Sequence, residues 1–75
     1  MYNNNSPSLT DREIEILEHL SQGHTLAIIA EQLHLSLETI RSHKKNIYRK
    51  LDINNGIQLG MWIEKHLIVN QLKIA

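Results

Sequence analysis

The 75-residue chain contains no cysteine, which excludes disulfide bonds, thiolate nucleophiles and thiolate-bound zinc. It has no apolar run near the roughly 18 residues that a membrane-spanning helix needs. The first ten residues are polar, unlike a signal peptide. We therefore expect a single small domain in the cytoplasm, with no membrane contact.

Sequence patterns of catalytic and metal sites are also missing. There is no glycine-rich phosphate loop and no nucleophile elbow around a serine. Five histidines are present, but no two are four residues apart with a carboxylate partner, as in a helical zinc site. We therefore expect a protein that is not an enzyme and that carries neither a metal nor a cofactor.

The charges balance in number but not in position. Eight basic and eight acidic residues give a net charge of zero, whereas DNA-binding domains are often strongly basic. Residues 11–18 nevertheless contain four acids and one base, and residues 39–51 contain five bases and no acid. The positive charge is thus concentrated in one short segment, which favours a local surface for anions.

Hydrophobic periodicity predicts an all-α domain of four helices, over residues 11–22, 26–33, 37–51 and about 55–65. Each of the first three helices follows a good N-cap residue: Thr10, which forms a capping-box pattern with Glu13, Thr25 and Ser36. The expected apolar stripe of the first helix consists of Ile14, Ile16, Leu17 and Leu20. Residues 1–8 are expected to form a flexible lead-in or linker and residues 9–75 the domain, although the tail at 67–75 has no decisive pattern.

The third predicted helix has two chemically different faces. At about 100° per residue, Ile40, Ile47 and Leu51 share one side, which we expect to be buried. The opposite side carries Arg41, Ser42, Lys45, Asn46 and Arg49, with Lys44 and Tyr48 at the flanks. Arginine and asparagine can each make paired hydrogen bonds to bases, and basic side chains neutralise phosphates. A short apolar helix, a tight turn and a basic helix together predict a helix-turn-helix domain that binds double-stranded DNA.

The sequence also resembles the LuxR/FixJ-type (GerE-like) DNA-binding domain. The resemblance starts at residues 9–17 (LTDREIEIL) and covers roughly residues 9–68. Its further matching positions are Gly23, Ile29, Ala30, Leu33, Leu35, Ser36, Thr39, Ile40, Arg41, His43, Asn46, Ile47, Lys50 and Leu51. It implies a bacterial transcription regulator whose third helix (37–51) enters the major groove of promoter DNA. It leaves open whether a receiver or sensor domain, as in a response regulator, precedes residue 1.

The expected DNA contacts combine the helical wheel with this resemblance. The resemblance implies that Arg41, Ser42 and Lys45 face bases or nearby phosphates, and that a second group lies near the DNA backbone or supports the helix: Thr39, Asn46 and Lys50. The wheel adds Lys44 and Arg49 as basic residues. His43 lies beside the apolar stripe, and we expect it to be structural.

The sequence departs from the expected pattern in one segment and at two single residues. Residues 26–30 are all apolar where the family often has polar residues that touch phosphate. His34 stands where glycine is common in the turn, so it is expected to adopt a positive φ. Gly56 stands where the family often has arginine at the start of the fourth helix.

The fourth helix is apolar on two sides, and the resemblance implies that it mediates dimerisation. Ile57 and Met61 share one face, and we assign the other face to a homodimer contact: Leu59, Trp62 and Ile63. The alternative is that the apolar tail folds back over this face. Two other functions stay open: a protein-interaction domain of the same fold without DNA binding, and a sigma-factor-type domain that reads promoters.

Overall fold

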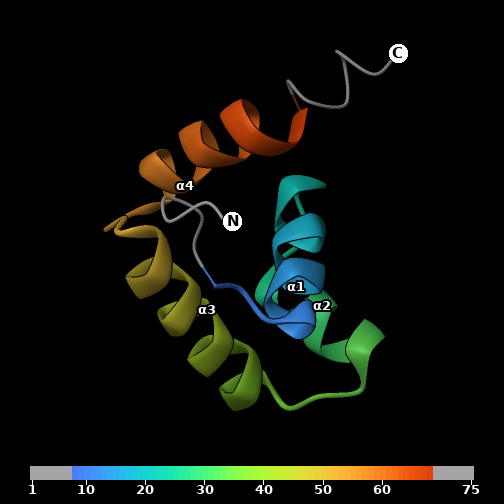
Figure 1. Ribbon diagram of the computed structural model, residues 1–75. Coiled ribbons are helices and arrows are strands. Elements are labelled where there is room, and N and C mark those ends of the chain that lie inside the picture. The colour runs from blue at the N-terminus through green and yellow to red at the C-terminus, as the bar shows by residue number, and fades with distance from the viewer. Residues whose placement is uncertain (1–7, 69–75) are drawn as a thin grey trace.

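The computed structural model describes residues 8–68, which form four α-helices and no strand (Figure 1). The helices are α1 (Asp11–Ser21), α2 (Leu26–Leu33), α3 (Leu37–Leu51) and α4 (Gly56–Ile63), and a π-helical segment (Glu64–Ile68) continues α4. The predicted all-α fold is confirmed, and the helix ends lie within two residues of those expected. The predictions for residues 1–7 and 69–75 lie outside the described part of the chain.

Side-chain caps fix where the helices begin. Thr10 and Glu13 form the predicted capping box: the Glu13 amide donates to Thr10 Oγ1 over 3.1 Å, and the Thr10 amide donates to Glu13 Oε1 over 2.9 Å. Such caps give hydrogen-bond acceptors to backbone amides that the start of a helix otherwise leaves without a partner. The N-cap side chains of the other helices accept from the third helical amide: Thr25, Ser36 and Asn55.

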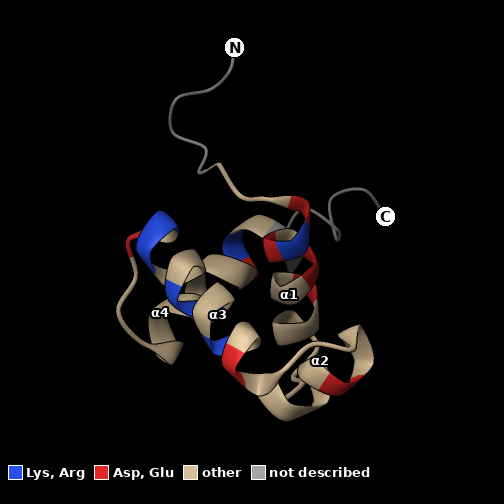
Figure 2. Cartoon of the chain, turned by 90° about the horizontal axis from the view of Figure 1, so that it is seen from below, with Lys and Arg blue, Asp and Glu red and all other residues tan. Residues whose placement is uncertain are grey.

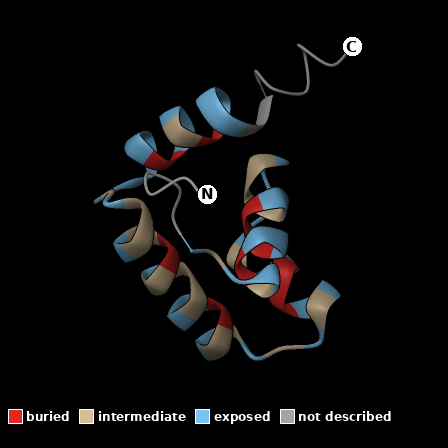
Figure 3. Cartoon of the chain, viewed as in Figure 1, coloured by how far each residue is buried: buried red, intermediate tan, exposed pale blue. Residues whose placement is uncertain are grey.

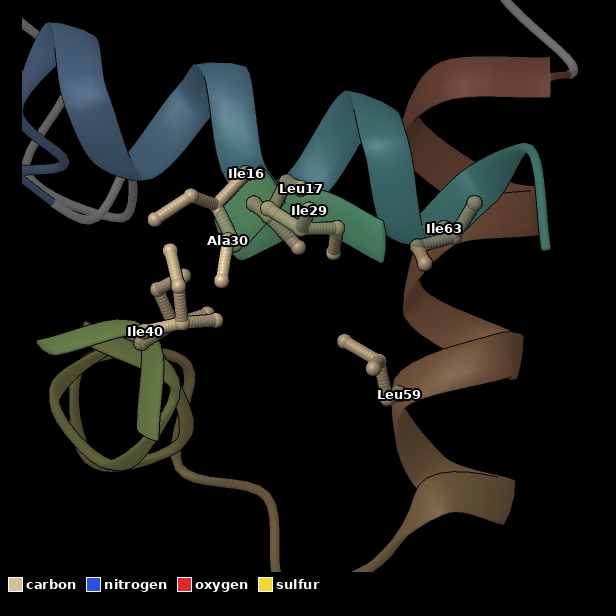
Figure 4. Close-up of a cluster of buried hydrophobic side chains, with 8 residues drawn as sticks. Ile16, Leu17, Ile29, Ala30, Ile40, Leu59 and Ile63 are labelled. Carbon is tan, nitrogen blue, oxygen red and sulfur yellow. The ribbon is translucent and has the colours of Figure 1, made fainter. Parts of the chain in front are cut away.

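All four helices contribute to one apolar core (Figure 4). Figure 3 shows their buried sides turned toward one another. The buried apolar residues are Ile16 and Leu17 from α1, Ile29 and Ala30 from α2, Ile40 and Ile47 from α3, and Leu59 and Ile63 from α4. Among residues 8–68, no helix is both long enough and apolar enough to cross a lipid bilayer.

One prediction about the core of α1 is wrong. Ile14 is 42% exposed, whereas Glu13 is only 3% exposed. The reason is geometric, because Glu13 lies three and four residues before the buried Ile16 and Leu17 and therefore shares their face. The burial of this carboxylate is made possible by a cation from α3, described below.

The two apolar faces of α4 are reversed relative to the expected assignment. Leu59 and Ile63, expected at a dimer contact, point into the core with exposures of 8% and 6% (Figure 4). Trp62 is half-buried and packs against the same core. Ile57 and Met61 face outward instead, with exposures of 78% and 64%. Since α4 packs on α1, one of its faces is needed to close the domain's own core. The apolar surface that α4 leaves to solvent is therefore formed by Ile57 and Met61.

Candidate nucleic-acid interface

The connection between α2 and α3 is a three-residue turn, His34 to Ser36, that sets the start of α3. His34 has φ 58° and ψ 41°, so the predicted positive φ is confirmed. This left-handed residue lets the Leu35 amide donate to the Ala30 carbonyl over 2.9 Å, which closes the end of α2. Leu35 packs on the core, and Ser36 caps α3. The result is a helix-turn-helix unit with α3 on the outside of the domain (Figure 1).

Four exposed polar residues beyond the first turn of α3 lie on one face of the helix: Arg41, Ser42, Lys45 and Arg49. Their spacing of three or four residues places them along one side of the helix. Arg41, Ser42 and Lys45 make no hydrogen bond or ion pair with any other residue of the described part of the chain. Figure 2 shows most Lys and Arg on α3 and more Asp and Glu on α1 than on any other helix. We call these four residues the basic face.

Two basic side chains of α3, those of Arg49 and Lys44, contact neighbouring residues on the same helix. Arg49 Nη2 donates to Asn46 Oδ1 over 3.2 Å, so the half-buried Asn46 amide orients a guanidinium of the basic face. The ammonium group of Lys44 lies 5.3 Å from the centroid of the Tyr48 ring, within the range of a cation–π contact. Both interactions restrain long side chains before any ligand is bound.

Thr39 belongs to the cap of α3 rather than to the basic face. Its amide donates to Ser36 Oγ over 3.0 Å, and the two hydroxyl oxygens lie 2.9 Å apart. The side chain is half-buried at the helix start. These contacts place Thr39 in the first turn of α3, beside its N-cap residue.

The ammonium group of Lys50 contacts two oxygen atoms outside the basic face. Its Nζ lies 2.8 Å from Glu13 Oε1 on α1, and it donates to the Ser8 carbonyl over 3.0 Å. Burial raises the pKa of Glu13, but hydrogen bonds from Lys50 and the Thr10 amide, with the Lys50 charge, outweigh it and leave the pKa below its ordinary value of 4.5. Glu13 is therefore an ionised partner for Lys50 at neutral pH.

Two acidic residues near the site were not assigned from the sequence. Glu13 was identified as a capping residue, and its i, i+3 relation to Ile16 was the available signal for burial. Glu38 is exposed in the first turn of α3, three residues before Arg41 and four before Ser42, so it shares their side. A carboxylate there disfavours contact with phosphate but can accept a hydrogen bond from a cytosine amino group.

Comparison with known proteins places this geometry in a family. The model of the family described as bacterial regulatory proteins, luxR family, matches residues 7–63, which is more than half of the chain. The transcriptional regulatory protein LiaR of Bacillus subtilis (strain 168) is 36% identical over 63 residues, which cover 84% of this chain and 30% of that protein. The transcriptional activator protein BglJ of Escherichia coli (strain K12) is 43% identical over 58 residues, 77% of this chain and 26% of BglJ.

A third relative points in the same direction. The response regulator protein VraR of Staphylococcus aureus (strain Mu3 / ATCC 700698) is 31% identical over 61 residues, which cover 81% of this chain and 29% of VraR. The chain thus spans less than a third of the length of these three relatives. The matched family consists of regulatory proteins, in agreement with the prediction that the chain is not an enzyme.

Proposed function

Because the chain belongs to the luxR family of bacterial regulatory proteins and carries that family's helix-turn-helix DNA-binding domain, we propose that it binds promoter DNA sequence-specifically through α3. The helix, Leu37–Leu51, lies in the major groove in this proposal. The observation that carries it is the exposure of Arg41, Ser42 and Lys45 on one side of α3 without partners in the described part of the chain. The match to the luxR family supports this role over a sigma-factor-type domain.

The contacts divide by chemistry. Arg41 can bond guanine through two donors, and Ser42 can bond any base edge. Lys45 and Arg49 lie one and two turns further along the same face, where the groove wall brings phosphates close. With a net charge of zero, the domain gains its attraction for DNA from these few cations, so the affinity of a single copy is modest.

Dimerisation through α4 completes the proposal. Ile57 and Met61 are exposed apolar side chains on one helix face, which is the kind of surface that a partner covers. In the described part of the chain, the space beside Gly56 and Gly60 beyond the backbone of α4 is open, so a second helix can approach α4 closely. We propose that two copies pair here on two half-sites, with Ile57 and Met61 in the contact and Trp62 at its edge. The buried Leu59 and Ile63 support the helix from behind.

Removal of two cations from the basic face tests DNA binding. The double variant Arg41→Ala/Lys45→Ala is expected to lose about 100-fold or more in affinity for preferred promoter fragments. The paired base contact of Arg41 contributes about 1–3 kcal/mol, and the loss of Lys45 removes a phosphate contact as well. The control is Arg12→Ala/Lys65→Ala, which removes two exposed charges outside α3 and is expected to bind as the unaltered protein does. Fluorescence anisotropy measures affinity across a salt series, and circular dichroism verifies that helix content and melting are unchanged.

An unchanged affinity of the α3 double variant overturns the assignment of this helix to DNA. If the unaltered protein does not bind any duplex at about 50 mM salt, where phosphate contacts are strong, the second function gains support. That function is a protein-interaction domain of the same fold, and the observations that favour it are the 39% exposure of Ile28 on the apolar α2 and the zero net charge.

A further inference from the structure

Lys50 links three parts of the molecule that are far apart in sequence. It lies in the last turn of α3, and its ammonium group meets Glu13 of α1 and the carbonyl of Ser8, which leads the chain into α1. Ser8 and Lys50 are 42 residues apart, and Glu13 and Lys50 are 37 apart. One side chain therefore fixes the C-terminal end of α3 against the beginning of the domain.

Without Lys50, the buried carboxylate of Glu13 would lack a positive partner. Glu13 is 3% exposed, so water reaches its carboxylate poorly. The Thr10 amide donates to the same oxygen, Oε1, over 2.9 Å. If Lys50 turned toward a phosphate, an ionised carboxylate would remain buried with a single hydrogen bond, which is strongly unfavourable.

The direction of Lys50 also separates it from the basic face. Five residues at about 100° each place it roughly 140° around the helix from Lys45. Its side chain is only 27% exposed, and its charge is already matched by Glu13. The cations of the basic face that are free or oriented outward are Arg41, Lys45 and Arg49.

We propose that Lys50 is a positioning residue for DNA recognition, which holds the C-terminal half of α3 against α1 and Ser8 and does not itself contact DNA. The proposal rests on the proposed function, since it concerns how α3 is presented to the groove. It makes Lys50 unlike the other lysines of α3, although the sequence places all three in one basic run.

Substitution of the buried acid distinguishes the two roles of Lys50 by the sign of the effect. If Lys50 is a positioning residue, Glu13→Gln weakens the tie, disorders the end of α3 and lowers DNA affinity several-fold. If Lys50 is a phosphate contact restrained by Glu13, the same substitution frees the ammonium group and raises both the affinity and its salt dependence. Increased affinity of Glu13→Gln therefore overturns the proposal.

The salt dependence of binding gives a second measure. Lys50→Met is expected to lower affinity without changing the slope of log affinity against log salt, because no phosphate contact is lost. Lys45→Met is the matched control on the basic face and is expected to reduce the slope by about one. Lys50→Arg, which keeps the donors for Glu13 and Ser8, is expected to restore most of the affinity. A slope reduced by about one in Lys50→Met contradicts the proposal.

A measurement on the unaltered chain keeps the test valid if a variant fails to fold. The side-chain ammonium signals of Lys45 and Lys50 are followed by NMR during addition of duplex DNA. We expect the Lys45 signal to shift and the Lys50 signal to stay, and a large shift of Lys50 alone overturns the positioning role. If the unaltered protein binds no DNA, the proposed function fails instead. The contact between Glu13 and Lys50 is then tested by the melting temperatures of Glu13→Gln, Lys50→Met and the double variant. Non-additive decreases show that the two side chains interact.

Discussion

The Nδ1 atoms of His19 and His24 lie 2.9 Å apart where α1 ends and the chain turns toward α2. Their ring centroids are 5.1 Å apart and the ring planes meet at 42°. A hydrogen bond between two ring nitrogens needs one donor and one acceptor, so the two imidazoles must differ at Nδ1. The pair joins the last turn of α1 to the residue after Gly23, and both side chains are half-buried.

The first prediction concerns the protons on these rings. One of His19 and His24 should carry its proton on Nδ1, while Nδ1 of the other is unprotonated. Long-range ¹H–¹⁵N NMR spectra distinguish the two ring nitrogens of each histidine. The exposed His34 provides an internal reference in the same spectra. Two rings that both carry their proton only on Nε2 would show that the hydrogen bond does not form.

The second prediction concerns acid stability. The pKa of Glu13 is lower in the folded protein than its ordinary value of 4.5, so the folded state favours the ionised carboxylate. Its contribution to stability is complete above about pH 4.5 and is lost as the pH falls through the lower, folded value. Urea unfolding between neutral pH and about pH 3 should therefore show a fall in the free energy of unfolding.

Glu13→Gln is the control for this acid effect. The amide cannot be ionised, so the variant should be less stable at pH 7, by about 1–3 kcal/mol, because the cation of Lys50 loses its partner. Below pH 4.5 the difference between the two proteins should shrink. A constant difference across this range would mean that the Glu13 carboxylate does not couple to folding.

The third prediction concerns the left-handed residue in the helix-turn-helix connection. His34 has φ 58° and is exposed, and the described residues supply no hydrogen bond to its side chain. For a residue with a Cβ, this conformation costs about 1–2 kcal/mol of stability. Glycine avoids that cost, but its more flexible unfolded chain lowers stability by about 0.4–1 kcal/mol. His34→Gly should thus stabilise the domain by about 0.5–1 kcal/mol in urea unfolding. His34→Ala removes the ring without relieving the backbone, and a gain of equal size there would exclude backbone strain as the cause.

The fourth prediction separates the two faces of α4. Leu59→Ala should reduce the free energy of unfolding by about 2–4 kcal/mol, because it leaves a cavity in the core. Ile57→Lys should change the stability of a single copy by less than about 0.5 kcal/mol, since Ile57 is 78% exposed. It should, however, weaken self-association on DNA. Thermal melts and sedimentation with a duplex of two half-sites measure the two effects, and unaltered association of Ile57→Lys would remove this face from the dimer contact.

The sequence predicted the helices well because their signals are local. The capping box at Thr10, the N-caps at Thr25 and Ser36, and the apolar spacing of Ile40 and Ile47 each act within a few residues, and the structure confirms them. The positive φ of His34 was also predicted, from its place in a tight turn. The outward direction of Arg41, Lys45 and Arg49 followed from the same helical spacing.

The features that the sequence did not predict depend on contacts between distant segments. Lys50 appeared as one more base in a basic run, because its partner Glu13 is 37 residues away. Ile14 was expected in the core because it is apolar, although the buried position belongs to Glu13. The faces of α4 could not be assigned correctly from periodicity alone, since both are apolar and only the packing of α4 on α1 decides which is covered.

The placement of α4 links assembly to local unfolding. α4 contributes two buried side chains, Leu59 and Ile63, to a core to which the other three helices contribute six, so a local opening of α4 removes these two side chains from the core. Such an opening would displace Ile57 and Met61 as well, because they belong to the same eight-residue helix. Any partner that covers these residues therefore shifts the opening equilibrium by mass action, and hydrogen exchange at α4 amides should slow as protein concentration rises.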